Sequence, residues 1–307
     1  MFASKLIHRQ RKKRSKLFRE RTTAGYLCAL PWIIGFLIFT LGPMVVSIII
    51  SFEEYNILNP PRFVGSQNYV KLLTGDSLFW KSLYNTLYIT VFGVPFGMVV
   101  GLLIALILNT KIKGITTFGT MFYLPAIVPI VASSLLWMWM YNPRFGLINF
   151  LLSQVGIEGP NWLSSKTWAK PAIIFMGLWG AGAGMIIYLA GLQGIPKQLY
   201  EAASIDGANW WRKFANITIP MLTPTIFFNM IMSIIVHFQI FTQAYIMTQG
   251  GPADSTLFYV FHLFNHAFRY FNMGYASALA WVLFIIILIA TLIQFRLAPK
   301  WVHYGGE

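Results

Sequence analysis

The sequence predicts an all-α integral membrane protein with six transmembrane helices. Of its 307 residues, 57% are hydrophobic and only 10% are charged, and long apolar runs recur along the chain. Soluble domains are roughly 45–50% apolar and about 25% charged. Lipid is therefore the expected environment of most of this chain. Backbone that crosses lipid has no water to bond to, so the apolar runs are expected to be helical.

Six apolar stretches are long enough to cross a bilayer, which takes about 20 residues of helix. None of the six contains Asp, Glu, Lys or Arg. They span residues 26–50, 84–108, 118–140, 172–192, 222–247 and 275–295. Prolines within them predict kinks or broken turns, because proline removes a helical hydrogen bond. These prolines are Pro31, Pro43, Pro95, Pro125, Pro129 and Pro224.

The distribution of Lys and Arg predicts the orientation of the chain. Cytoplasmic loops of membrane proteins carry an excess of these residues. The two terminal tails and the loops after the second and fourth stretches together hold 16 of the 23 Lys and Arg residues. We therefore expect both termini in the cytoplasm, with a basic tail at 1–25, a transmembrane domain at 26–296 and a C-terminal tail at 297–307.

The formal net charge of +14 does not require a nucleic-acid partner. Nine of the basic residues lie within the first 21 positions, beside the first apolar stretch. A tail that rests on anionic membrane lipid is therefore favoured over a nucleic-acid-binding surface. A secretory signal also begins with basic residues, but stretch 26–50 is too long for one and lacks a small-residue cleavage site. We expect it to remain as the first transmembrane helix.

Two apolar segments of the outer loops have helical spacing but are too short to cross a bilayer. Segments 145–155 and 257–270 are expected to be helices that lie along the outer surface. His262 and His266 are four residues apart in the second segment and in principle share a metal ion. No third ligand is visible nearby in the sequence, so we expect two ordinary interfacial histidines and no metal site.

The only long loop on the expected cytoplasmic side spans residues 194–220. Pro196 suits a first helical turn, and the Glu-Ala-Ala run at 201–203 favours helix. Gly207 permits a backbone geometry that ends this helix before a second one begins over 208–217. The sequence therefore predicts a helix, a sharp turn and a second helix that leads into the fifth transmembrane stretch.

Two roles for this loop fit its residues equally well. A compact bent element suits contact with a cytoplasmic partner, with Glu201 available to pair with a basic group. An interfacial helix on the inner leaflet would instead suit Trp210 and Trp211 beside Arg212 and Lys213. The physical properties of these side chains leave both roles open.

The spacing of the loop resembles a known motif. It is similar to the EAA loop of ATP-binding-cassette (ABC) importer permeases. That motif consists of Glu-Ala-Ala, three residues, Gly, nine residues, Ile, one residue, a hydrophobic residue and Pro. The matching residues are Glu201, Ala202, Ala203, Gly207, Ile217 and Pro220, with Asp206 and Ala208 fitting the fuller form. Ile219 departs from the usual Leu. Further similarity at 146–149 and 250–252 extends over nearly the whole chain, which resembles the MalF-type carbohydrate-uptake permeases without their large extra outer domain.

This resemblance implies the type I ABC importer permease fold, with a cytoplasmic helix-turn-helix coupling loop, in a bacterial cytoplasmic membrane. It implies four partners: a second six-helix permease, an ABC ATPase dimer, an extracytoplasmic solute-binding protein and a sugar. The implied ATPase-coupling residues are Glu201, Ala202, Ala203, Asp206, Gly207 and Pro220. The chain has no Gly-x-x-x-x-Gly-Lys-Ser/Thr phosphate loop, so ATP and Mg are expected on the ATPase and no cofactor or catalytic site on this chain.

Polar residues inside the spans are candidates for the transport pathway, because leaving them in lipid is unfavourable. Asn229, Ser233 and His237 recur every four residues and so share one helical face. A polar seam between helices explains the same pattern, and the residues do not distinguish it from a pore lining. Gln239 and Gln243, with Tyr245, are expected to face elsewhere and are weaker candidates.

The family resemblance adds positions to this pathway. Counted from the EAA loop, the sugar-contacting positions of the family fall on Trp179, Gly180, Ser233 and His237. Gly180 and Ser233 keep the residue of the maltose carrier, whereas Trp179 and His237 differ in type, which argues against maltose itself. Trp179 offers an aromatic face for stacking on a sugar, and the glycines around it allow close approach.

Two other functions remain as alternatives. The cargo of the same machine is in principle another polar solute such as glycerol phosphate, although phosphate favours fixed cations and none lies in a span. An ion-coupled secondary carrier usually needs a charged residue within the membrane, and the charge-free spans argue against it.

Overall fold

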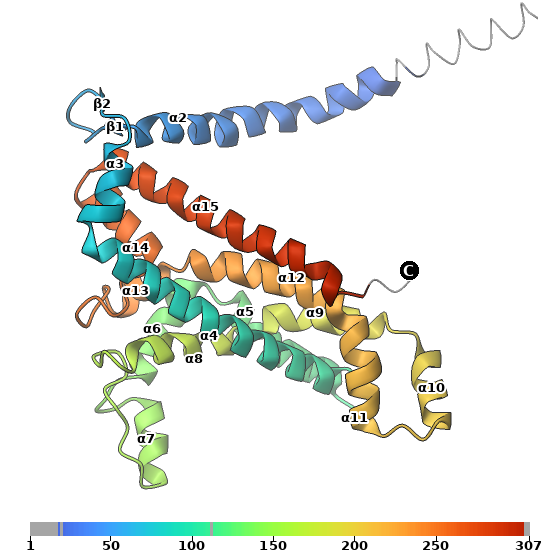
Figure 1. Cartoon of the computed structure of the whole chain (residues 1–307). Coiled ribbons are helices and arrows are strands. Elements are labelled where there is room, and N and C mark those ends of the chain that lie inside the picture. Colours follow the sequence, from blue (N-terminus) through green and yellow to red (C-terminus); the bar gives the residue numbers. More distant parts are fainter. Residues whose placement is uncertain (1–17, 19–20, 111–112, 304–307) are drawn as a thin grey trace, which may run out of the picture.

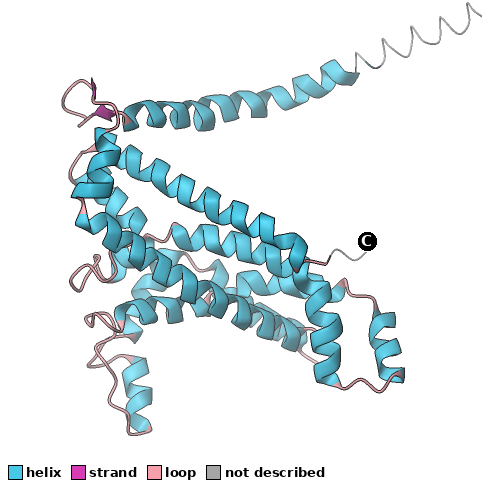
Figure 2. Ribbon diagram, in the orientation of Figure 1, coloured by secondary structure: helices cyan, strands magenta, loops and turns pink. Residues whose placement is uncertain are grey.

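The computed structural model describes residues 18, 21–110 and 113–303, and it is mostly helical (Figures 1 and 2). Four helices are long and apolar enough to cross a membrane, and six spans result if each of two bent helix pairs counts as one. All six predicted stretches fall on these helices. The long helices are Arg21–Ser51, which ends in α2 (Gly42–Ser51), α4 (Ser77–Leu108), the run Trp210–Met247 and the run Met273–Lys300.

The two bent pairs form the third and fourth spans. Helices α5 (Ile115–Ile127) and α6 (Ile130–Met140) meet at 97°, with Pro129 capping α6. Helices α8 (Ala169–Trp179) and α9 (Gly182–Gln193) meet at 48°. Pro129 predicts the first break. No proline lies at the second break, which falls between Gly180 and Gly182. Pro95 lies within the continuous helix α4, so a proline alone does not break a span here.

Helix α4 lies at the centre of the bundle and packs against α8, α9 and α12 (Ile219–Phe238). One hydrophobic cluster joins the ends of α4, α9 and α12 through Leu108, Tyr188 and Leu222. Another joins α4 to α15 (Met273–Leu297) through Phe79 and Leu279. The first helix stands apart from the bundle in Figure 1. Its last part, α2, contacts α15. The most apolar window of that first helix has none of its residues buried.

The short elements gather at the two ends of the bundle (Figure 1). One end holds the hairpin of β1 (Glu53–Glu54) and β2 (Arg62–Phe63), α3 (Gln67–Val70) and the π-helix η2 (Lys71–Gly75). The same end holds α7 (Leu147–Gln154), α13 (Thr242–Met247), α14 (Tyr259–Phe264) and the π-helix η4 (Asn265–Arg269). The two segments predicted to be short helices are thus confirmed as α7 and the α14–η4 pair, and their placement on the outer side of the membrane stays a prediction. The opposite end holds α10 (Lys197–Ile205) and α11 (Trp210–Lys213), and η3 (Phe214–Thr218) continues α11 into α12.

Most of the basic tail predicted at 1–25 lies outside the described residues, as does Lys111. The division into tails and a transmembrane domain, and the cytoplasmic placement of both termini, therefore stay predictions. The 3₁₀ turn η5 (Ala298–Lys300) ends the last long helix, and Val302 just beyond it packs on Phe227 of α12.

Candidate functional site: the 194–220 loop and a cavity between the spans

The 194–220 loop forms a helix, a sharp turn and a second helix, as predicted. Helix α10 ends at Ile205, and Gly207 follows with φ of +72°, a left-handed conformation that favours glycine. The N–H of Ala208 donates to the carbonyl of Ala203 at 2.8 Å, and the N–H of Gly207 donates to that of Ser204 at 3.1 Å. These two bonds are those of a Schellman motif, which ends a helix by satisfying its last carbonyl groups.

The boundaries of both loop helices differ slightly from the prediction. Pro196 precedes the first helical residue as the N-cap of α10 rather than lying in its first turn. The second helix begins at Trp210 and not at Ala208, because the side chain of Asn209 accepts a hydrogen bond from the N–H of Arg212 at 2.9 Å and so caps the helix at that point.

Two side-chain contacts tie the helices of this loop together. Lys213 Nζ donates to Ser204 Oγ at 2.7 Å, and the hydroxyl groups of Tyr200 and Thr218 lie 2.9 Å apart. No described residue of α10 is buried, and Ile205 is 87% exposed. Glu201, Ala202, Asp206 and Gly207 are exposed as well, whereas Ala203 and Pro220 are partly covered. The loop is therefore an internally braced element that presents a free surface.

A cavity of about 540 Å³ lies where the third, fourth and fifth spans are interrupted. Residues on both sides of the α5–α6 and α8–α9 breaks line it, together with residues of α4 and the 239–243 segment. The side chains with polar or aromatic character are Ser133, Trp179, His237, Gln239, Phe241, Thr242 and Gln243. The described lining residues include no Asp, Glu, Lys or Arg. The cavity therefore offers hydrogen bonds and aromatic surface without fixed charge.

Two lining side chains are held by specific packing. His237 Nδ1 lies 2.8 Å from the carbonyl oxygen of Ser233, one turn earlier in α12. A Cβ atom added at Gly93 of α4 would lie 2.9 Å from His237 Nε2, so the histidine fits only because position 93 has no side chain. The ring of Trp179 meets that of Trp137 edge to face at 6.1 Å and remains 37% exposed.

A polar cluster forms at the end of the bundle opposite α10, where Asp76 precedes α4. Asp76 Oδ2 accepts hydrogen bonds from His262 Nε2 at 2.8 Å and from the Tyr275 hydroxyl at 2.6 Å. Burial disfavours the carboxylate, but the hydrogen bonds from Tyr275 and His262 outweigh burial and hold the pKa of Asp76 below its usual value. Burial and the nearby His262 lower the pKa of His266 to about 4, so that His266 is neutral at pH 7.

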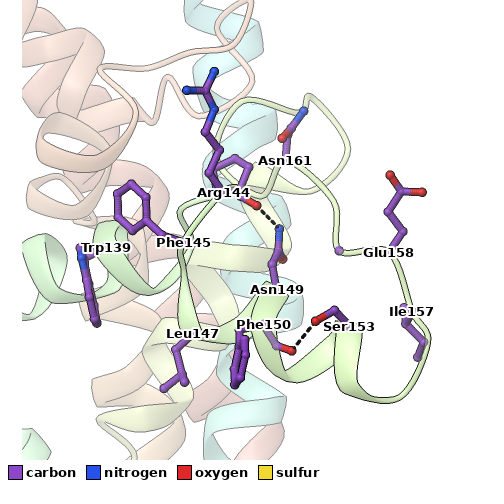
Figure 3. A pocket seen from close by; sticks show the side chains of 12 residues that line it. Trp139, Arg144, Phe145, Leu147, Asn149, Phe150, Ser153, Ile157, Glu158 and Asn161 are labelled. Atoms are coloured by element: carbon purple, nitrogen blue, oxygen red, sulfur yellow. Dashed lines mark hydrogen bonds between the residues drawn. The ribbon is translucent and has the colours of Figure 1, made fainter.

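A groove runs along α7 (Figure 3). Asn149 Oδ1 accepts a hydrogen bond from Trp162 Nε1 at 2.7 Å, which joins α7 to the segment that follows it. Arg144 and Glu158 both line the groove, whose volume is about 720 Å³. This groove is open, carries both signs of charge, and lies at the end of the bundle opposite α10.

Comparison with known protein families gives one match, which covers residues 77–303. It is the family described as "binding-protein-dependent transport system inner membrane component". The chain belongs to this family. It is thus a multi-pass membrane permease of an ABC importer, and the ion-coupled carrier considered from the sequence is not supported.

Individual relatives agree with this family over nearly the full chain. The permease is 44% identical over 96% of both chains to a protein named "Probable ABC transporter permease protein YesP" of Bacillus subtilis. It is 34% identical over 92% of its length and 96% of the other to "Trehalose/maltose transport system permease protein MalF" of Thermococcus litoralis. Among solved structures, a chain of a bacterial ABC transporter "involved in the import of the acidic polysaccharide alginate" matches with a TM-score of 0.79 and 26% identity, covering 93% of the permease and 99% of that chain.

The cavity of the permease contains some of the predicted pathway residues and not others. Trp179, Gly180 and His237 line it, whereas Asn229 and Ser233 are not among its described lining residues. Asn229 is 5% exposed, and its Nδ2 has no hydrogen-bond partner among the described residues. Ser233 instead contributes its carbonyl oxygen to the contact with His237 Nδ1.

Two residues that the sequence placed elsewhere do line the cavity. Gln239 and Gln243 were expected to face away from it, and this expectation was wrong. The helical-face argument assumes one continuous helix, but α12 ends at Phe238 and α13 begins at Thr242. Residues 239–241 are not helical, so the helical wheel of α12 does not give the direction of the two amides, and both residues line the cavity. No sequence signal marks this break, because no proline lies within it.

The sequence shows no third ligand near His262 and His266, but the structure brings one beside them. Asp76 lies beside both histidines although 186 residues separate it from His262. Sequence separation hides such a contact, because only the packing of α14 against the start of α4 brings the three side chains together.

Proposed function

We propose that this permease carries a sugar or oligosaccharide into the cytoplasm through the cavity at its interrupted spans. The observation that carries the proposal is a lining of neutral polar and aromatic side chains, led by Trp179, His237, Gln239 and Gln243. Aromatic faces and uncharged hydrogen-bonding groups suit a polyhydroxylated neutral ligand. Support also comes from the names of the trehalose/maltose relative and of the alginate importer.

Glycerol phosphate is a weaker candidate for the cargo. A phosphate group favours paired Arg or Lys side chains in a pocket that excludes water. The described residues around the cavity supply neither, and only His237 among them is titratable. A neutral saccharide therefore fits this lining better.

The energy for transport is proposed to enter through the 194–220 loop. Helix α10 would seat in a groove of a separate ABC ATPase, with Glu201 pairing with a basic side chain and Ala202 and Ala203 allowing close approach. Gly207, Asp206 and Pro220 would set the angle at which the loop transmits ATPase closure to α12. The free surface of α10 and the braces from Ser204 and Tyr200 support this role. ATP and Mg would bind to the ATPase, because the chain has no phosphate-loop motif.

Other surfaces of the molecule suit the remaining partners. The unburied first helix would pack against a second six-helix permease, and the groove along α7 would contact an extracytoplasmic solute-binding protein. The distribution of Lys and Arg favours cytoplasmic termini, with the basic tail on anionic lipid of the bacterial cytoplasmic membrane.

The test measures uptake of labelled oligosaccharides by cells that express the complete transporter. Glu201→Lys should abolish uptake while the protein still reaches the membrane. The matched control is Glu54→Lys, the same charge reversal on the exposed strand β1, which should transport normally. Normal uptake by Glu201→Lys would contradict the coupling role of the loop. If the transporter took up only a phosphorylated solute and no oligosaccharide, the proposal that its cargo is a sugar would be refuted.

A further inference from the structure

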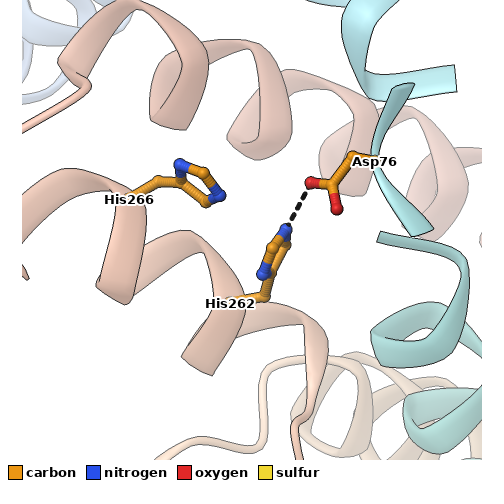
Figure 4. A group of neighbouring side chains, drawn as sticks. All are labelled: Asp76, His262 and His266. Carbon is orange, nitrogen blue, oxygen red and sulfur yellow. Dashed lines mark hydrogen bonds and ion pairs between the residues drawn. The ribbon is translucent and has the colours of Figure 1, made fainter. Parts of the chain in front are cut away.

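Three potential metal ligands meet where α14 and η4 pack against the start of α4 (Figure 4). Asp76 caps the N-terminus of α4, His262 lies in α14, and His266 lies one turn later in η4. One ligand atom from each residue lies within 4.8 Å of the others. Two sequence-distant segments therefore converge on a single point with two imidazoles and a carboxylate.

This set of ligands matches the chemistry of a divalent transition metal. Zinc binds imidazole nitrogen and carboxylate oxygen at roughly 2.0–2.2 Å, and three protein ligands with one open position are a common arrangement. Tetrahedral geometry at those bond lengths separates neighbouring ligand atoms by roughly 3.4 Å. The observed separations are close enough that small side-chain rotations would complete the site. Magnesium and calcium favour all-oxygen ligands and fit poorly.

The surroundings already orient these ligands. Asp76 Oδ1 accepts hydrogen bonds from the N–H groups of Leu78 and Phe79, which leaves Oδ2 directed at the histidines. The Tyr275 hydroxyl donates to that same Oδ2 and would remain as an outer-shell partner that holds the carboxylate in place.

His266 gives independent evidence that hydrogen bonds within the protein do not satisfy every polar atom of this cluster. Its Nδ1 is buried and has no hydrogen-bond partner among the described residues. The side-chain oxygen of its neighbour Asn265 is also buried and unpartnered. Both residues line a pocket of about 480 Å³ that also contains Asp76 and His262. Buried polar atoms without partners are uncommon and call for an explanation.

We propose that Asp76, His262 and His266 bind one divalent transition-metal ion of the zinc class, which clamps the start of α4 to α14 and η4 on the outer side of the membrane. Lys71 and Arg269 line the same pocket and oppose a cation, and the carboxylate of Asp254 in that pocket is already paired with Lys81 at 3.1 Å. The site should therefore be weaker than a closed four-ligand structural zinc site.

The test uses the full-length chain, purified with a tag free of histidine and stripped of metal by a chelator. Isothermal titration with zinc and metal analysis by mass spectrometry should give one zinc ion per chain, and cobalt should give the visible absorption of a tetrahedral site. Zinc should also raise the thermal unfolding midpoint, whereas magnesium should leave it unchanged. Absence of zinc binding by the wild-type chain would overturn the proposal.

Variants locate the bound ion. His266→Gln and Asp76→Asn should each weaken zinc binding by roughly tenfold or more, since even outer-shell changes cost 10–100-fold. Asp76→Asn keeps a side chain that caps helices well and so guards against simple misfolding. His303→Gln is the matched control, because His303 is exposed and lies outside the cluster. Unchanged affinity in both cluster variants, or an equal loss in the control, would place the metal elsewhere and refute the site.

Discussion

The contact between Gly93 and His237 fixes a titratable side chain at the wall of the cavity. Both residues line the cavity, and His237 Nε2 lies 2.9 Å from the position that a Cβ atom at residue 93 would take. Because the lining has few polar groups, the position of this one imidazole determines much of the hydrogen bonding available to a ligand. A change of one methyl group at Gly93 should therefore affect transport rather than only stability.

Gly93→Ala is expected to displace His237 and reduce uptake. The added Cβ would lie 2.9 Å from His237 Nε2, and overpacking of this kind typically costs about 1–3 kcal/mol unless the side chain moves. Uptake of labelled oligosaccharide and the thermal unfolding midpoint should both be measured. Gly97→Ala is the control, because position 97 also lines the cavity but has open space around its missing Cβ. Equal uptake by the two variants would show that His237 does not shape the pathway.

Single residues were predictable where local geometry defines their role. Gly207 was identified as the end of a helix because few other residues adopt its left-handed backbone, and the structure confirms that place. Gln239 and Gln243 were misplaced because a helical wheel does not foresee a break without proline. Asp76 was missed because its partners are distant in sequence. Their contact depends on how α4 and α14 pack, which no local pattern encodes.

Broken spans are the elements that create the cavity. The α5–α6 and α8–α9 pairs each interrupt one span, the gap between α12 and α13 interrupts another, and all three interruptions contribute lining residues. The sequence predicted six spans and the break near Pro129, because apolar length and proline are local signals. The α8–α9 break depends on contact with α5, which a single stretch of sequence does not reveal.

Gly182 allows α9 to approach α5 at this second break. A Cβ atom at position 182 would clash with the carbonyl oxygen of Phe122, a contact that only backbone movement relieves. Gly182→Ala should therefore lower the thermal unfolding midpoint and separate the two helices. Gly177→Ala serves as the comparison, since nothing lies within 4 Å of its missing Cβ. If both variants unfold at the same temperature as the wild type, the close approach does not stabilise the bend.

The whole molecule divides into a packed bundle and a helix that the bundle barely covers. The family match covers residues 77–303 and omits the helix Arg21–Ser51. Within the described residues, that helix is joined to the bundle mainly through α2 on α15, where Trp281 Nε1 donates to Ser47 Oγ at 3.1 Å. Hydropathy predicted this span correctly, but hydropathy does not report whether lipid or protein covers a helix. Its exposure became visible only in the three-dimensional arrangement.

An apolar helix face without an intrachain partner is suited to a second permease, since helices in lipid associate through close packing. Val46 and Ile49 are 52% and 54% exposed on this helix. Replacing both by Trp should reduce co-purification of the second permease and leave the unfolding midpoint of the isolated chain unchanged. Ser47→Ala is the opposite control: it removes the bond from Trp281, costs about 1 kcal/mol of stability and leaves association intact. Undiminished co-purification of the double Trp variant would assign this face to lipid, and the second permease would then have to contact another surface of the bundle.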